Sequence, residues 1–591
     1  MSFTTDSIAK RLFTTAISAS MFVLCLPLMA MSAEITSSGD VLQTVGGQYG
    51  AHVNSMTNGA TITTDLTHAN VNIYGSGSTL TWQALNTAPG QSLNFHFSAA
   101  GQVALNNVVG GSMSRFAGSL TSSGESGRTI ISNPNGMLLE NGSYFNVNAL
   151  DLTTKNVNWD GNLNGKIDFM HNASTAGITI GQGDPSKMAV VRVAKDLNIV
   201  APNISINAAD IKTGVDANGN LLHNGKGDLR LITADGVTFY APNTVIAGGD
   251  KFNVTGAANT ADYGNITIQK ASIAVADSSS GKVYLVAKKD INLQNGSELK
   301  NAVVQSQGNI NIASSAINNS TINSNAYIVA SAQSYINNSS IFAKGSFSGY
   351  NSVVENSQIN VNRNIFLFDN SRMSNTTARS GELIFLDHSI INNNSNIHSD
   401  INFTLVNNTS IDNSTISANQ NIVLSSSGVH NSIINSGYVY AYHQSGISGS
   451  RFSLNNCLEM TDSSVNNSIM DIKERLSLNH SFVDNSSITV GNIVALGNGA
   501  AITNSSVFAS NSFDIKASTI SNSSLVAAKD IKVYDNSVLK QSNLYAGNGI
   551  KLAFDSHLYA SAYVNRKMIV APRPWQRLFV GNLKFSFGSL F

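Results

Sequence analysis

The stretch Ser510–Ala546, SNSFDIKASTISNSSLVAAKDIKVYDNSVLKQSNLYA, holds two copies of one short pattern. The pattern recurs about every 18 or 19 residues over positions 289–564, with the loose consensus x-D/N-I-x-I-x-x-S-x-I-x-N-S-x-I-x-A. Phe513 and Ile515 alternate with polar neighbours, which predicts a strand with one buried face. A unit this short cannot bury a core alone and must stack on its neighbours. The sequence therefore predicts triangular coils of three short strands each, stacked into an all-β rod.

Asn-Ser and Asn-Asn-Ser triplets recur through the array and are predicted to form a corner of each coil. Asparagine tolerates left-handed and turn conformations and can bond its own backbone. At equivalent corners of successive coils, asparagine amides can also bond along the stack as a ladder. Triplets such as 337–339 also match a glycosylation sequon, but their recurrence with the coil favours the structural interpretation.

The composition excludes several classes of protein. Net charge is zero and charged residues make up only 12% of the chain, which argues against nucleic-acid binding. The apolar content of 42% is too high for a disordered polar chain. No proline lies between Pro242 and Pro572, so none removes a ladder hydrogen bond there.

The N-terminus is predicted to be a secretory signal over residues 1–33, with Lys10 and Arg11 before an apolar stretch that ends in small residues. Removal of this segment takes away Cys25 and leaves Cys457, so the mature chain has no internal disulfide. Lipidation of Cys25 is a weaker alternative, because bulky residues precede it. A transmembrane helix is another, but Pro27 interrupts the apolar run.

Between the signal and the array, residues 34–288 are less regular, with short predicted strands joined by Gly-, Thr- and Asn-rich turns. We expect this part to cap the β-helix and run into the array at 289–564. The tail, 565–591, is basic and aromatic without acidic residues. For the tail we favour a frayed cap or the altered end of a once longer protein. A surface-retention element or a strand-like outer-membrane signal is the alternative.

Three short motifs follow one another within residues 105–137. They are LNNVVGG from Leu105 to Gly111, FAGSL from Phe116 to Leu120, and NPNGM from Asn133 to Met137. NPNG alone would be an ordinary turn sequence. In this order, the three motifs resemble the N-terminal secretion domain of two-partner secretion exoproteins, the filamentous haemagglutinin and high-molecular-weight adhesin family.

The chain also departs from the pattern of that family. Asn107 stands where arginine is frequent, and Leu139 and Glu140 stand where glycine is common. The second motif of the haemolysin-type branch, NPNL, is absent. These features place the resemblance with the adhesin-like branch.

The resemblance implies a right-handed parallel β-helix with an N-terminal capping secretion domain. It also implies export through the periplasm of a Gram-negative bacterium, by an outer-membrane transporter with periplasmic binding modules. The residues carried over as the secretion motif are Asn106, Gly110, Gly111, Gly118, Asn133, Pro134, Asn135 and Gly136. Pro134 fixes one backbone angle and Gly136 permits positive φ, so a tight turn is expected first and direct contact with the transporter second.

No catalytic, cofactor-binding or metal-binding residues are predicted. Residues 160–168 mimic a calcium loop, but position twelve is His171 rather than glutamate, so a β-turn is expected. The segment 215–220 is likewise predicted to be a turn. Histidines lack metal-ligand spacing, and no nucleophile or phosphate-binding motif occurs.

The sequence thus predicts a secreted or surface-associated rod that is adhesive or acts as a spacer and is not an enzyme. Its partner would be a glycan or protein on a host or neighbouring cell, bound by a neutral Asn/Ser-rich face. Two alternatives stay open. One is a carbohydrate-active β-helix enzyme, and the other is a cytolysin of the same secretion class.

Overall fold

The computed structural model describes residues 32–159, 167–170, 172–222, 227–233, 236–239, 252–255, 264–275, 281–553, 555–559, 562–565 and 568–570. Most of the expected signal, most of the expected tail and residues 160–166, which belong to a predicted β-turn, lie outside the described residues. Among the residues described, no helix is long and apolar enough to cross a membrane. Cys457 has a free thiol and is half-buried.

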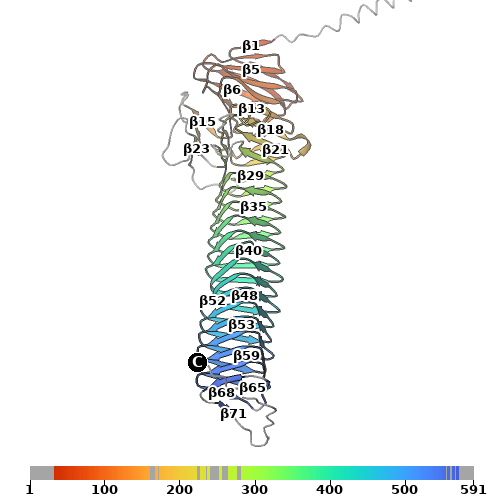
Figure 1. Ribbon diagram of the computed structural model, residues 1–591. Helices are drawn as coiled ribbons and strands as arrows, with labels where there is room; N and C mark the ends of the chain where they lie inside the picture. Colours follow the sequence, from red (N-terminus) through yellow and green to blue (C-terminus); the bar gives the residue numbers. More distant parts are fainter. Residues whose placement is uncertain are drawn as a thin grey trace, which may run out of the picture.

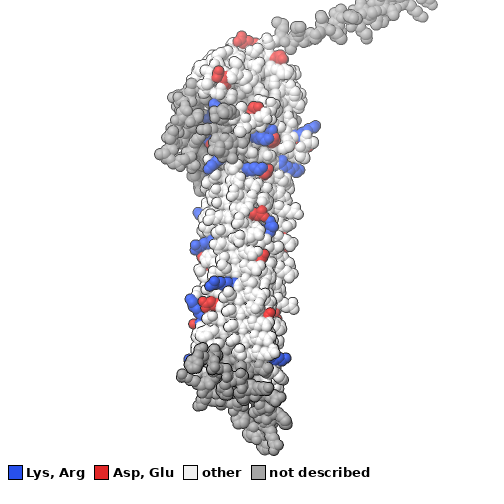
Figure 2. Space-filling view, in the orientation of Figure 1, with Lys and Arg blue, Asp and Glu red and all other residues white. Residues whose placement is uncertain are grey.

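The chain forms a long rod that is widest near its N-terminal end (Figure 1). Strands make up 62% of the structure, which winds into a β-solenoid of about 21 turns. The short 3-10 helix η1 (Pro185–Lys187) interrupts the strands of the described chain. Charged side chains are sparse along the face of the rod seen in Figure 2. The predicted fold class, a parallel β-helix, is confirmed.

One coil shows the plan of the array. It contains β34 (Ile328–Ser331), β35 (Tyr335–Asn337) and β36 (Ser340–Ala343). Each strand pairs in parallel with the equivalent strand of the next coil, in β37 (Phe347–Tyr350), β38 (Val353–Glu355) and β39 (Gln358–Val361). The coil is therefore triangular, with three strands per turn as predicted.

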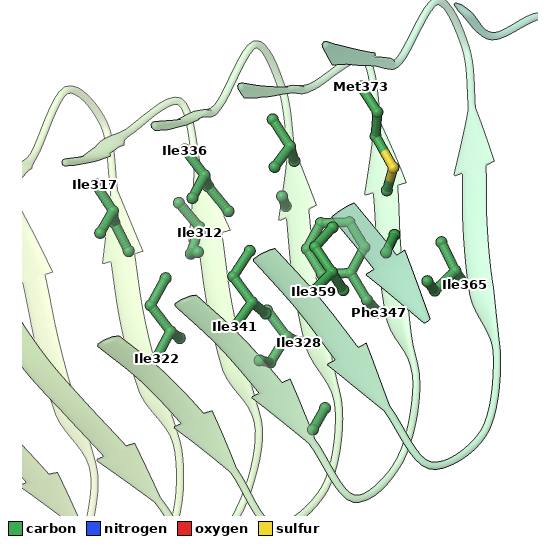
Figure 3. Packing of buried hydrophobic residues seen from close by; sticks show 14 of the residues in the cluster. Ile312, Ile317, Ile322, Ile328, Ile336, Ile341, Phe347, Ile359, Ile365 and Met373 are labelled. Carbon is green, nitrogen blue, oxygen red and sulfur yellow. The ribbon is translucent and has the colours of Figure 1, made fainter. Parts of the chain in front are cut away.

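The interior is a continuous stack of aliphatic and aromatic side chains. Ile328 lies between Ile310 and Phe347 in register, and Ile336 lies above Val354 in the adjacent row. These side chains are at most 1% exposed, and Figure 3 shows the rows facing one another across the interior. Each buried aliphatic side chain contributes about 1.5–3 kcal/mol, so stacking provides the core that one coil lacks.

The predicted asparagine ladder is present at one corner. Asn319, Asn338 and Asn356 have positive φ values of 51°, 46° and 49°. The Asn338 amide donates to Asn319 Oδ1 over 2.7 Å, and the Asn375 amide donates to Asn356 Oδ1 over 2.8 Å. Asparagine suits this corner because it tolerates the left-handed backbone conformation and because its side-chain amide donates a hydrogen bond to the preceding coil.

A ladder of buried serines lies beside the asparagines and was not predicted. The Ser339 hydroxyl donates to Asn337 O over 2.8 Å and accepts from the Ser320 amide over 3.1 Å. The same pair of bonds recurs at Ser357, in the next coil. A hydroxyl can donate and accept at once, so one small side chain satisfies backbone groups of two coils.

Asp484 occupies a place in the corner ladder and makes this corner sensitive to acid. The Thr503 hydroxyl and the Asn504 amide donate to its Oδ1 over 2.5 and 2.8 Å, and these bonds lower the pKa of the carboxyl. The folded-state pKa lies below the unfolded one, so the stabilisation is present above about pH 4 and is lost as the pH falls through the folded value. We expect the urea midpoint to fall less between pH 5 and pH 2 in Asp484→Asn than in the wild type. An equal fall in both proteins would contradict this role.

Antiparallel strands close the N-terminal end of the rod. β2 (Gly39–Val45) pairs with β3 (Tyr49–Met56), and β3 pairs with β6 (Gly77–Leu85), all antiparallel. β6 then pairs in parallel with β8 (Val103–Val108), where the β-helix begins. The cap covers the apolar interior that the first coil would otherwise expose.

A four-stranded antiparallel sheet lies beside the rod (Figure 1). Its strands are β15 (Asn156–Trp159), β16 (Ile167–Met170), β23 (Gly236–Phe239) and β24 (Phe252–Thr255). It covers a second apolar cluster on the outer surface of the rod, which was not predicted. The buried members are Val103, Leu105, Ile130, Ile167, Phe169, Val200 and Ile232.

Beside this second cluster runs a row of buried polar side chains, one from each coil. Asp151, Asn198 and Arg230 occupy equivalent positions on successive strands. Arg128 binds Asp151 through two hydrogen bonds of 2.6 and 2.8 Å, and the Asn198 amide donates to Asp151 over 2.7 Å. Arg230 donates to Asn198 Oδ1 over 3.0 Å and also binds Asp228. Each member has a charged or polar partner, as buried charges require.

Candidate functional site: the secretion motif

Two of the three motifs form stacked turns. LNNVVGG ends β8 (Val103–Val108) and leads to β9 (Ser114–Phe116). NPNG connects β11 (Arg128–Ser132) to β12 (Met137–Leu139). Because β8 pairs with β11 and β9 pairs with β12, the two turns lie one coil apart at the same corner.

Asn133 is the centre of this corner and is fully buried. Its amide donates to Ser112 O over 3.1 Å and to Ser114 Oγ over 2.9 Å, so it holds the turn of the preceding coil. Its Oδ1 accepts from the Asn135 backbone over 2.9 Å. The Gly136 amide donates to Asn133 O over 3.0 Å and closes the turn, with Gly136 at φ 98°. Gly136 supplies the positive φ that the sequence analysis anticipated.

Asn135 and Pro134 extend the contacts of the turn in opposite directions. The Asn135 amide donates to Gly110 O over 2.7 Å, in the preceding coil. Pro134 O accepts a hydrogen bond from the Ser174 hydroxyl, in the following coil. The NPNG turn therefore joins three successive coils.

Asn106 is a buried polar residue that bridges neighbouring coils. Its Oδ1 accepts from Trp82 Nε1 over 3.0 Å, and its amide donates to Ile130 O over 3.0 Å and Ala104 O over 3.1 Å. Both Asn106 and Trp82 are fully buried. Such a satisfied polar group fixes the register of the coils, since an aliphatic replacement would leave Trp82 Nε1 without its acceptor.

The glycines of the motif differ sharply in their surroundings. A Cβ on Gly110 would lie 1.9 Å from Gln83 O, and one on Gly118 would lie 2.2 Å from Gln91 O. A Cβ on Gly111 would meet nothing within 4 Å. Close approach of backbone segments thus demands glycine at Gly110 and Gly118, while Gly111 is not sterically required.

Glu140, one of the departures from the family pattern, is neutralised within the chain. Its Oε1 pairs with Arg115 Nη2 over 2.8 Å and accepts from the Tyr49 hydroxyl over 2.9 Å. Burial, followed by the bond to Glu140, raises the pKa of Tyr49. The three residues tie the N-terminal cap to the coils. The sequence analysis missed this network, because it joins residues 91 positions apart.

Only part of the corner faces outward. Val109 is 59% exposed and Met113 is 37% exposed, and Gly111, Ser112 and Asn135 are exposed beside them. Val109 and Met113 are large apolar side chains that lie outside the two buried apolar clusters of the described residues. The surface formed by Val109, Ser112, Met113 and Asn135 is called the corner surface below.

The sequence analysis also raised the question of metal-binding residues. In the described part of the chain, no three His, Cys, Asp or Glu residues gather closely enough to hold a metal. The Asp216 carboxylate accepts from the Asn218 and Asn220 backbones over 2.9 and 2.8 Å, so this calcium-like segment is a turn, as predicted. These bonds lower the pKa of Asp216.

Known proteins are similar to this chain over its N-terminal part. Residues 33–320 match the family described as the TPS secretion domain, so the match continues past the predicted boundary at residue 288. A heme/hemopexin-binding protein of Haemophilus influenzae is 33% identical over 87 residues, which is 14% of this chain and 9% of that protein. The chain thus matches only a small part of this relative's length.

Among solved structures, the secretion domain of HMW1 from Haemophilus influenzae is similar at 11% identity and a TM-score of 0.24, covering 91% of this chain and 99% of that one. The match therefore assigns residues 33–320 to the two-partner secretion domain family, and a domain of this family indicates a two-partner secretion exoprotein.

Proposed function

We propose that this exoprotein is an adhesive rod whose corner surface is recognised by its outer-membrane transporter. The exoprotein class implies a cognate transporter. The periplasmic modules of that transporter would bind the corner surface, and the released or cell-attached rod would bind a glycan or protein on another cell. The observation that carries the proposal is the pairing of a secretion domain with a long, uniform, largely uncharged shaft.

The buried residues beneath the corner surface support its role as a contact, because they hold it in a fixed shape. Asn106, Asn133 and Gly136 are buried, and their hydrogen bonds within the chain stabilise the turns and the neighbouring strands. Val109 and Met113 project from those turns without contributing to the core. Exposed apolar side chains on a rigid, hydrogen-bonded platform are typical of a protein contact.

Substituting the exposed side chains separates recognition from folding. We expect Val109→Ser/Met113→Ser to accumulate in the periplasm and to fall about tenfold in the medium, because the loss of apolar contact weakens binding by about 1.4 kcal/mol or more. Immunoblots of medium and periplasm measure this, with Leu221→Ser, another exposed apolar side chain at 57%, as the control. Deletion of residues 106–136 should abolish export while the chain still reaches the periplasm. Normal secretion of the double variant would contradict the proposal that the transporter binds the corner surface.

The adhesive role is tested on the purified full-length chain. We expect it to bind cultured cells in flow cytometry without lysing red cells and without depolymerising polysaccharides. Many weak contacts along the shaft would give binding that rises steeply with surface density. Failure to bind any cell type would remove the adhesive role. Red-cell lysis would support a cytolysin, and polysaccharide cleavage would support a carbohydrate-active enzyme.

A further inference from the structure

Aromatic side chains gather on one outer face of the array, formed by the first strands of six successive coils. The strands are β37 (Phe347–Tyr350), β40 (Ile365–Phe368), β43 (Leu383–Asp387) and β46 (Asn402–Val406), followed by the second halves of β48 (Thr415–Ser425) and of β50 (Ile433–Tyr442). The outward side chains called the aromatic strip below are Tyr350, Phe366, Phe368, Phe385, Tyr438, Tyr440 and Tyr442.

The rings form two groups in contact across and along the strands. In the first, the Tyr350 and Phe368 ring centroids lie 5.0 Å apart, and Phe368 and Phe385 lie 5.9 Å apart. In the second, Tyr438 and Tyr440 are 6.0 Å apart with ring planes within 6° of parallel. Tyr442 continues this row, 6.2 Å from Tyr440.

Uncharged side chains connect the two groups. Phe385 is in register with Thr404, Thr404 with Val423, and Val423 with Tyr440. On the same two strands as Thr404 and Val423, the Asn421 amide donates to Asn402 Oδ1 over 2.9 Å. The strip is therefore continuous from coil to coil, with amide and hydroxyl groups between its two aromatic ends.

The strip is also nearly free of charge. The six strands hold no lysine or arginine at any of their outward positions. Their one carboxylate, Asp387, is bonded to His388 Nδ1 over 2.6 Å and to Asn407 Nδ2 over 3.0 Å. Burial, followed by the nearby Glu459 carboxylate, raises the pKa of Tyr440 and Tyr442, so their hydroxyls stay protonated donors at neutral pH. An anionic ligand would find no cation on these strands.

The size of the strip argues against a second protein chain. Strands about 4.8 Å apart and residue steps of about 3.3 Å give a plane of roughly 24 by 13 Å, or about 300 Å². A stable protein interface covers about 800 Å² on each partner. A long, narrow, uncharged row of rings with interspersed amides instead suits a chain of sugar rings, whose C–H faces pack on aromatic rings while their hydroxyls bond the polar groups.

We propose that the aromatic strip is a binding site for a neutral glycan chain lying along the rod. This rests on the proposed adhesive function and assigns its ligand class and place. It differs from the Asn/Ser-rich face expected from the sequence, since those side chains are largely engaged in the corner ladders. The Tyr438–Tyr442 row is the end richest in hydroxyls and carries the polar part of the contact.

Affinity electrophoresis of the full-length chain tests the site, with galactomannan and a soluble β-glucan as neutral probes and dextran sulfate as the anionic one. We expect at least one neutral probe to retard the wild type and dextran sulfate not to. The variant Tyr438→Ser/Tyr440→Ser/Tyr442→Ser should bind about tenfold more weakly, a change of about 1.4 kcal/mol. The control Phe482→Ser/Phe508→Ser/Tyr545→Ser removes exposed aromatics off the strip, and it should bind as the wild type does. Circular dichroism must show all variants folded.

Three results would overturn the proposal. One is that neither neutral probe binds the wild type, and the second is that the strip variant binds as well as the wild type. The third is a concentration-dependent dimer in sedimentation velocity that the strip variant loses, which would make the strip a contact between rods.

Cell binding separates this inference from the proposed function. If the wild type adheres and the strip variant adheres equally, the adhesive role stands and the strip does not. If the wild type binds a neutral probe through the strip but adheres to no cell, the strip stands and the adhesive role falls.

Discussion

Replacing Gly110 by alanine is expected to reduce secretion into the medium at least about tenfold, while the same change at Gly111 leaves it unaltered. A methyl group on Gly110 would lie 1.9 Å from Gln83 O, which is backbone and cannot swing aside. The turn must then shift, and the bond from the Asn135 amide to Gly110 O is strained or lost. Overpacking of this kind costs about 1–3 kcal/mol or more.

Gly111 is the matched control for this experiment, because a Cβ there meets nothing within 4 Å and the residue is exposed. Immunoblots of medium and periplasm give secretion, and protease resistance of the periplasmic chain reports the fold. Gly118→Ala should follow Gly110→Ala, since its Cβ would lie 2.2 Å from Gln91 O. Equal secretion of the Gly110 and Gly111 variants would show that the close approach is not needed for export.

The second large effect is expected at the buried ion pair between Arg128 and Asp151, beside the second apolar cluster. Asp151→Ala should destabilise the secretion domain by about 3–5 kcal/mol, because Arg128 is left as an uncompensated buried cation. The Asp151 side chain is 0% exposed and that of Arg128 is 17% exposed. Asn198 also loses the oxygen that accepts its amide.

The double variant Arg128→Met/Asp151→Leu separates the cost of an unpaired charge from the value of the pair. Replacing a buried pair by apolar side chains is often close to neutral, so this variant should lose much less stability than Asp151→Ala. Urea unfolding followed by circular dichroism measures both, and the comparison uses midpoints, because a long solenoid need not unfold in two states. A double variant as unstable as Asp151→Ala would mean that the pair itself stabilises the domain.

The motif residues were proposed from the sequence, but their different structural roles were not predicted. Asn106 and Asn133 were predicted only as polar residues of the motif, whereas the structure shows that both are buried and bridge coils. Gly110 and Gly111 are adjacent and differ entirely in what surrounds them. Their roles depend on which backbone lies opposite, and that is set by neighbouring coils rather than by neighbouring residues.

The aromatic strip was missed for a related reason. Phe366, Phe385 and Tyr440 belong to different repeats, and the repeats differ in length: Phe366 and its partner Phe385 are 19 residues apart, whereas Val423 and its partner Tyr440 are 17 residues apart. A register shift between Ala418 and Asn421 accounts for one of these two residues. The signal available in the sequence was the alternation of aromatics in IFLF and YVYAY, which marks outward positions but not their alignment.

The chain of residues alone determined the local rules of this molecule: strands of period two, aliphatic side chains inward, asparagine at the corners and a repeat that must stack. These rules follow from side-chain size and backbone preference, which act within a single coil. Which glycine is indispensable, which asparagine is buried, and which rings share a face were decided only by the tertiary structure. Those properties depend on contacts between coils, where a residue meets a partner some 18 to 25 positions away through hydrogen bonds and van der Waals contact.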